Sequence, residues 1–304
     1  MTFSELLKTF AENILPIFLI SGSAYLVGKY LALDSRTVGR LVFYFFGPVL
    51  IFNLITQSQL PFDEMLKTAG FAAAVMLSCG LIAFLGGLAL RLERRALMAV
   101  ILVSMFANNG NFGLPLVSFA FGPSALAHSS IYFITSAVMV NSIGVLIASL
   151  GHTDIKRALL GLLRVPLIYA LIAALIVIRF ELTLPVPLDR SVTLVAGAAV
   201  PMMLVLLGLE LQKAQWTRNL RGLTLGTSVR LLAGPAVALL LTPLFGITGA
   251  ARQGSVLEAS MPSAVMNTVL AAEYNLDSSL VTGTILVTTL LSPLTLTPLI
   301  LFLK

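Results

Sequence analysis

Reactive side chains are scarce in this sequence. Cys79 is its one cysteine, so no disulfide forms within the chain, and its apolar surroundings indicate a small buried residue. The two histidines, His128 and His152, stand apart from each other and have no carboxylate or thiol at ligand spacing. We therefore expect neither a metal site nor a bound organic cofactor.

Charge is scarce as well. Only 11% of the 304 residues are charged, whereas soluble domains carry about a quarter. Hydrophobic residues make up 58% of the chain, and its mean hydropathy is +1.00. The net charge of +6 lies in short clusters between apolar runs, without interleaved aromatics, so we expect no nucleic-acid partner. These features predict an all-α polytopic membrane protein with the bilayer as its solvent.

Ten apolar runs are long enough to cross a hydrocarbon core of about 30 Å. They cover residues 12–31, 39–57, 68–90, 97–121, 128–150, 160–179, 191–212, 222–244, 253–273 and 279–302. The segment before the first run lacks a basic region, and no A-x-A-like cleavage site follows the run. We therefore expect ten transmembrane helices, the first of them retained and not cleaved as a signal peptide.

The basic residues between these runs are distributed unevenly over the two sides. The side of the N-terminus carries Lys8, Lys67, Arg179, Arg190, Arg252 and Lys304. The opposite side carries Lys29, Arg36, Arg40, Arg91, Arg94, Arg95, Lys156, Arg157, Arg164, Lys213, Arg218 and Arg221. Basic loops stay in the cytoplasm, so we expect an inner-membrane protein with both termini on the outer side. Trp216, beside Arg218, is expected at the membrane interface.

The two halves of the chain resemble each other. Arg36–Pro48 and Arg190–Pro201 each place a proline about twelve residues after an arginine. SMFANNGN, starting at Ser104, and SMPSAVMN, starting at Ser260, keep the same separation between Ser-Met and Asn. Because five helices are an odd number, residues 1–151 and 152–304 would form inverted five-helix repeats, which are typical of secondary transporters.

Helix-breaking and polar residues interrupt the fourth and ninth runs. Gly and Pro disfavour helix, and bare backbone groups facing hydrocarbon cost several kcal/mol each. Such breaks in corresponding positions of inverted halves indicate a substrate site, where the helix ends after each break suit a carboxylate. A structural kink is the alternative. The residues expected to bind substrate at these breaks are Asn108, Asn109, Gly110, Asn111, Pro115, Pro262, Ser263 and Asn267.

Two charges lie well inside expected spans and are therefore functional candidates. Arg230 could bind the substrate carboxylate, while Glu258 could help to hold a coupling Na⁺ or H⁺. Alternatively, the two side chains pair with each other and tie their helices together. Asn141, in the fifth run, is a further coupling candidate, with an interhelical hydrogen bond as its alternative role.

Asn108–Pro115, with the sequence NNGNFGLP, resembles the auxin efflux carrier family, which includes plant auxin carriers and bacterial malonate transporters. The resemblance covers essentially the whole chain. It implies an elevator-type carrier of a small organic anion, with a scaffold of helices 1, 2, 6 and 7 and a transport part of helices 3–5 and 8–10. It also implies a homodimer.

Glu258–Pro262 is more distantly similar to bile-acid sodium symporters, in which an acidic residue and nearby carbonyls hold sodium. That similarity adds Met261 to the ion-coupling candidates, whereas Pro262 stands where that family tends to have an amide. Sodium coupling, proton coupling and facilitated diffusion stay open, as does a membrane sensor without flux. We expect no enzyme, because no mid-span aspartate pair or H-E-x-x-H motif is present, and the inverted repeat favours a carrier over a channel.

Overall fold

The computed structural model describes residues 2–58, 60–149 and 165–304. Over these ranges the chain is helical, and its β-type pairing is one isolated antiparallel bridge between Ala107 and Ser263. The all-α prediction is confirmed for these ranges. Several expected features lie outside the described residues, namely the boundary between 151 and 152, His152, Lys156, Arg157, Arg164 and the start of the run 160–179.

The helices of the first half of the chain follow one another with short connections. They are α1 (Phe3–Thr9), α2 (Leu15–Leu31), α3 (Ser35–Leu41), α4 (Gly47–Ser58), α5 (Phe62–Ala89), α6 (Arg94–Met105), α7 (Leu114–Met139) and α8 (Val145–Ala148). The second half contains α10 (Pro166–Arg179), α11 (Val186–Leu211), α12 (Leu220–Ser228), α13 (Gly234–Leu241), α14 (Gly249–Ala259), α15 (Met266–Glu273) and α16 (Ser278–Leu303).

Among the described residues, seven continuous helical stretches are long and apolar enough to cross a membrane. They are Phe3–Leu31, Ser35–Ser58, Phe62–Ala89, Asn109–Ala148, Val186–Leu211, Leu220–Leu241 and Ser278–Leu303. Helix α10 is apolar but shorter. The number differs from the expected ten partly because α6, α14 and α15 have only 12, 11 and 8 residues, since the helix is interrupted where both breaks were predicted.

Asn109–Ala148 is twice as long as a membrane crossing needs, and Gly122 explains why. Its φ of 76° and ψ of −164° lie outside the helical region, in a conformation that is almost restricted to glycine. Pro123 follows directly and fixes the start of the next helical segment. The helix of residues 114–121 is therefore separate from the helix that begins at Pro123, although they form one continuous stretch.

Most of the π-helical turns in the described residues precede a proline. A proline lacks the N–H of the helical hydrogen bond, and its ring clashes with the carbonyl four residues earlier. A π-helical turn inserts one residue and moves that carbonyl away. The turn and proline pairs are η1 (Phe10–Ile14) with Pro16, η2 (Val42–Phe46) with Pro48, η3 (Asn109–Gly113) with Pro115, and η5 (Val229–Ala233) with Pro235. The remaining turn, η4 (Val140–Gly144), is not followed by a proline.

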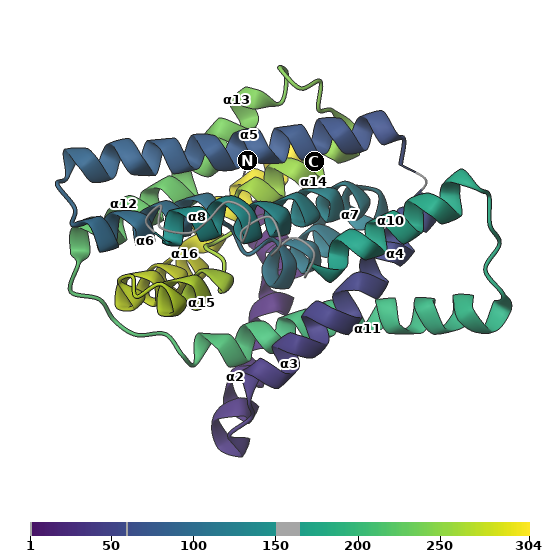
Figure 1. The fold of residues 1–304 in the computed structure, drawn as a ribbon, viewed down its shortest axis with the longest axis horizontal. Helices are drawn as coiled ribbons and strands as arrows, with labels where there is room; N and C mark the ends of the chain where they lie inside the picture. The colour runs from purple at the N-terminus through teal and green to yellow at the C-terminus, as the bar shows by residue number, and fades with distance from the viewer. Residues whose placement is uncertain (1, 59, 150–164) are drawn as a thin grey trace.

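The helices pack in two groups. In one, α2 and α4 pack against α11, and α4 also packs against α10. In the other, α5 packs against α6 and α7, α14 against α7, and α12 against α6 and α16. Figure 1 shows α5 across the upper part of the molecule with α13 above it, α2 projecting from the lower edge and α11 at the lower right. The two chain ends lie close together in this view, and α1 packs against α16.

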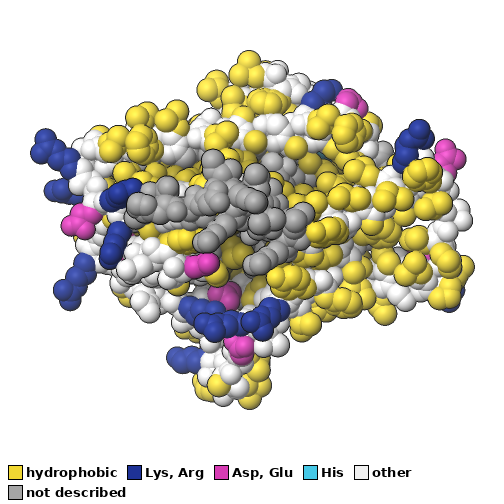
Figure 2. Space-filling model, in the orientation of Figure 1, with side chains coloured by type: hydrophobic (Ala, Val, Ile, Leu, Met, Phe, Trp, Pro, Cys, Tyr) yellow, Lys and Arg dark blue, Asp and Glu magenta, His cyan; other side chains and the backbone are white. Residues whose placement is uncertain are grey.

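Apolar side chains cover much of the outer surface. Figure 2 shows them over most of the visible face, with charged side chains gathered at a few places, mainly near its edges. Leu194 and Leu244 are 77% and 76% exposed, which would be costly in water and suits contact with lipid. The fold is therefore that of a multi-span membrane protein.

Replacing Gly122 by alanine should destabilise the protein. A side chain in this backbone conformation costs about 1–3 kcal/mol, so the melting temperature of the detergent-solubilised protein should fall. Gly197→Ala is the matched control, because Gly197 lies within α11 and a Cβ there would meet no atom within 4 Å. Equal melting temperatures for the Gly122 and Gly197 variants would contradict the assigned conformation.

Candidate functional site

The two interrupted helices cross and pair with each other at their breaks. Helix α6 ends at Met105 and α14 ends at Ala259. Beyond these ends, the Asn108 N–H donates to the Pro262 carbonyl (2.7 Å), and the Ala264 N–H donates to the Phe106 carbonyl (2.9 Å). These bonds flank the Ala107–Ser263 bridge. Backbone groups freed by the breaks are therefore satisfied between the two segments, away from lipid.

Two asparagine side chains strengthen the crossing from opposite directions. Asn109 donates through Nδ2 to the backbone carbonyl (2.9 Å) and Oε2 (2.7 Å) of Glu258. Asn267 donates through Nδ2 to the Phe106 carbonyl (3.2 Å) and to Ser263 Oγ (3.1 Å). Each asparagine thus bonds across to the other interrupted helix, and both are almost completely buried.

Arg230 joins the ends of both first half-helices. It lies in η5, and only 1% of its surface is exposed. Nη1 donates to the Ser104 carbonyl (2.8 Å) at the end of α6, and Nη2 donates to the Ala259 carbonyl at the end of α14. A cation at two helix C-termini is favourable, because both ends carry partial negative charge. Gly234 makes room, since a Cβ there would lie 2.7 Å from Nη2.

Glu258 is fully buried and has one carboxylate oxygen without a partner. Oε2 accepts from Asn109, while Oε1 has no hydrogen bond within the described ranges. The carboxylate lies so close to Gly113 that a Cβ there would be 2.7 Å from Glu258 Cδ. No ion pair joins Glu258 to Arg230 in the part of the chain that the structure describes. The two expected charges are both at the crossing, each with other partners.

Several buried polar atoms at the crossing lack a hydrogen-bond partner among the described residues. They are two donors, Asn108 Nδ2 and Arg230 Nε, three acceptors, Asn109 Oδ1, Glu258 Oε1 and Asn267 Oδ1, and the Ser104 hydroxyl. A buried polar group without a partner costs about 1–3 kcal/mol. Six such groups around one backbone crossing are therefore a candidate site for a polar ligand, an ion or water.

The other expected residues lie at or near the same crossing, with two exceptions. Met261, Pro262 and Ser263 are buried in the second break, and Gly110 and Pro115 are buried after the first. Asn111 is only half-buried, and no hydrogen bond engages its side chain within the described ranges. Asn141 donates to the Ala137 carbonyl of its own helix (2.8 Å), in place of the expected interhelical bond.

One contributor to the site was missed by the sequence analysis. Thr288 of α16 accepts from the Ser263 N–H at 3.1 Å and donates to the Thr284 carbonyl at 2.7 Å, and both threonines are fully buried. Their spacing of four residues places them on one helix face, which is the signal that could have identified them. Thr288 thus stabilises the second break by accepting a hydrogen bond from its backbone.

The described chain is a multi-span helical membrane protein with a polar crossing of two interrupted helices. A sequence model of the family described as "Membrane transport protein" matches residues 9–153 and 153–300, so the chain belongs to this family. It is therefore a membrane transporter, and the predicted resemblance to the auxin efflux carrier family is confirmed.

Three relatives illustrate the range of this family. An uncharacterized transporter of Methanothermobacter thermautotrophicus is 28% identical over 262 residues, covering 85% of this chain and 86% of its own length. A putative malonate transporter of Rhizobium meliloti is 25% identical over 301 residues, covering 94% of this chain and 93% of its own. Auxin efflux carrier component 3a of Oryza sativa subsp. japonica is 26% identical over 126 residues, which are 40% of this chain and 20% of that carrier.

Replacing Arg230 by glutamine should destabilise the protein, because glutamine carries no charge and cannot reach both helix ends. Losing charge-assisted bonds to buried carbonyls should cost about 2–4 kcal/mol, measured as a fall in melting temperature in detergent. Arg230→Lys should also lose stability, since one ammonium cannot span both ends. The exposed Arg190 provides the control Arg190→Gln. The assigned role is wrong if the Arg230 and Arg190 variants melt together.

Proposed function

We propose that the chain is a secondary-active carrier of a small organic anion and that the crossing of the interrupted helices is its substrate site. The observation that carries this proposal is the group of buried, unpartnered polar atoms around the paired breaks. Transporters of inverted-repeat architecture bind substrates at such helix breaks near the bilayer midplane. A carboxylate or dicarboxylate such as malonate, or an auxin-like acid, is the proposed substrate class, in keeping with the names of the relatives.

The crossing offers the positive potential that an anion requires. The helical segments starting at Asn109 and Met266 begin at the breaks, and helix N-termini carry partial positive charge and free N–H groups. Asn108 Nδ2 adds an unengaged donor. Arg230 adds a full positive charge at the crossing, although two of its nitrogens already bind carbonyls. In this proposal Asn109, Gly110, Asn111, Pro115, Pro262, Ser263 and Asn267 shape the site.

We propose that Glu258 couples transport to a cation or proton. Its free Oε1 is fully buried, and the amide oxygens of Asn109 and Asn267 are further unpartnered acceptors at the crossing. Oxygen ligands of this kind suit a hard cation or a transferred proton. Met261 follows in the second break, and Asn141 is the more remote candidate in this proposal.

We further propose ten membrane crossings arranged as inverted halves, residues 1–151 and 152–304. Support comes from the reciprocal bonds at the breaks, in which each half donates to the other. Gly122 supports the count, since it separates the second half of the proposed fourth crossing, residues 97–121, from the proposed fifth crossing. The two packing groups support a scaffold of helices 1, 2, 6 and 7 beside a transport part, working as an elevator-type homodimer.

The proposed location is a bacterial inner membrane with both termini periplasmic, as the distribution of Lys and Arg predicts. A sodium-coupled symporter of the bile-acid type and a sensor without flux are the alternatives. We propose no enzymatic activity, because the family and the named relatives are transporters. A flux measurement separates carrier from sensor.

Asn109→Ala and Asn267→Ala should each lower uptake of labelled malonate into proteoliposomes. Each removes cross-helix donors and changes the site, so we expect a fall of about tenfold or more. Asn53→Ala is the matched control, because this asparagine of α4 bonds through its side chain to Gln57 (3.0 Å). Unchanged uptake by folded Asn109 and Asn267 variants would place the site elsewhere. Absence of flux for any mono- or dicarboxylate or indole acid would favour a sensor.

Glu258→Gln should abolish the dependence of uptake on an ion gradient. The substitution keeps the size of the side chain and removes its charge, so gradient-driven uptake should fall at least about tenfold, while exchange of malonate across the membrane continues. Inward sodium and proton gradients applied separately identify the coupling ion. A Glu258→Gln variant that keeps full gradient dependence would exclude this carboxylate from coupling.

A further inference from the structure

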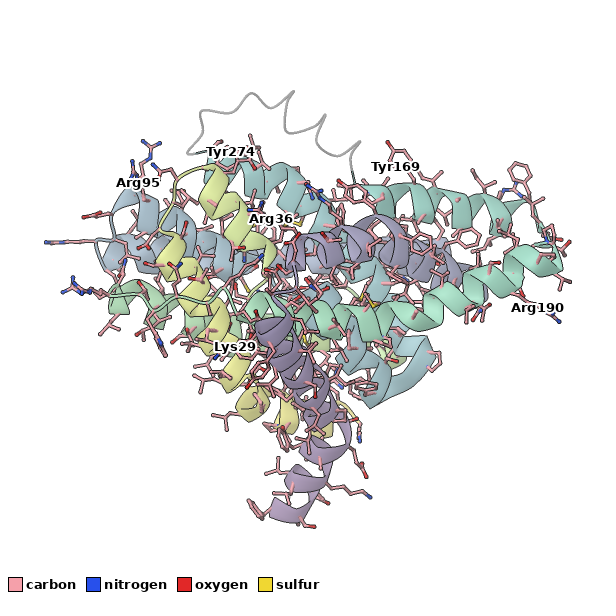
Figure 3. All side chains as sticks on the ribbon, turned by 90° about the horizontal axis from the view of Figure 1, so that it is seen from below. Lys29, Arg36, Arg95, Tyr169, Arg190 and Tyr274 are labelled. Atoms are coloured by element: carbon pink, nitrogen blue, oxygen red, sulfur yellow. The ribbon has the colours of Figure 1, made fainter. Side chains whose placement is uncertain are left out.

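A polar cavity lies away from the crossing, at one end of the helices. Its volume is about 490 Å³, and it is formed by the α5–α6 connection, the start of α12 and the α15–α16 connection. Arg91, Arg95 and Arg221 line it, and we call it the arginine pocket. Figure 3 shows Arg95 at the end of the molecule opposite Arg190.

The three arginines are exposed and electrostatically unsatisfied. Among the described residues, none of the three side chains takes part in an ion pair or a hydrogen bond. Of the two carboxylates in the lining, Asp277 is already engaged, since its Oδ1 accepts from the Leu280 N–H (3.0 Å). Glu93 is exposed and faces the same cavity. Three arginines against two carboxylates leave the pocket with an excess of positive charge.

Helix ends add to this positive potential. Helices α6, α12 and α16 all begin at the arginine pocket, and a helix N-terminus carries partial positive charge, which at α16 is offset by the Asp277 carboxylate. Asn219 and Asp277 cap α12 and α16, whereas the Glu93 side chain does not cap α6. Arg95 and Arg221 lie in the first turns of α6 and α12, where basic residues are disfavoured. An anion in the pocket would remove this electrostatic cost.

The backbone at Arg91 shows a similar local cost. Its φ of 53° is left-handed, a conformation in which glycine is usual after a helix end. The Leu92 N–H returns to the Gly87 carbonyl (3.0 Å), which closes the end of α5. An arginine in this conformation costs about 1 kcal/mol relative to glycine. A role for the charged side chain in the pocket would offset this cost.

We propose that the arginine pocket binds the phosphoryl group of an anionic ligand. Guanidinium groups match phosphate oxygens in pairs, and three arginines around one cavity can engage a phosphate monoester or diester from several sides. Trp216 and Leu220, 75% and 66% exposed, precede Arg221 and indicate the level of the membrane interface. A phosphoryl group at the membrane interface has two sources, the headgroup of an acidic phospholipid and phosphate in solution. This site does not depend on the proposed substrate site.

The variant that tests the proposal combines Arg91→Gly with Arg221→Gln. Glycine suits the left-handed position, so the charge is removed without adding backbone strain. Arg218→Gln is the matched control, because Arg218 is a nearby exposed residue outside the pocket lining. Melting temperatures in phosphate-free buffer establish that all three proteins are folded.

Two measurements distinguish the sources of the phosphoryl group. The first titrates inorganic phosphate against chloride at equal ionic strength and follows thermal stability, and the second measures retention of phosphatidylglycerol against phosphatidylcholine by native mass spectrometry. We expect the double variant to weaken one of these interactions at least about tenfold, while Arg218→Gln leaves it unchanged. A phosphate effect identifies a soluble ligand, and a lipid effect identifies a headgroup. Equal behaviour of all three proteins in both measurements would overturn the proposal.

Discussion

The structure depends on satisfying the backbone groups that two interrupted helices expose inside an apolar environment. Each break frees donors and acceptors that lipid cannot bind, and the two breaks satisfy each other through the paired segments around Ala107 and Ser263. Arg230 completes the arrangement by binding the carbonyl ends of both preceding half-helices. The candidate site is therefore part of the polar crossing, since its unpartnered atoms are those that the pairing of the two breaks leaves without hydrogen bonds.

Much of this could be predicted from residue type. Asn, Gly and Pro within apolar runs indicated both breaks, and the corresponding positions of the breaks in the two halves indicated one shared site. The partners of Arg230 could not be predicted, because they are backbone carbonyls, which any residue would supply. The bond from Ser263 to Thr288 depends on how α16 lies behind the break, which is a property of tertiary packing.

Helix boundaries were harder to predict than helical character. The gap between the fourth and fifth runs, residues 122–127, does coincide with a boundary, because the non-helical Gly122 separates two helices there. The π-helical turns had a signal that hydropathy does not read, namely a proline two residues after the turn, as at Pro16 and Pro115. The backbone accommodates these prolines by inserting a residue, which leaves the helices continuous.

Arg230 also has a mechanical consequence. Its guanidinium bridges α6 and α14 while the segments beyond them are paired, so the two half-helices are fastened together on both sides of the break. Sliding one half-helix past the other would leave a buried cation and several carbonyls without partners, which costs free energy. Sliding between two apolar helix faces has no such cost. We therefore expect α6 and α14 to move together as one rigid body in any displacement of the crossing. Flexibility is then expected at the contacts between apolar helices.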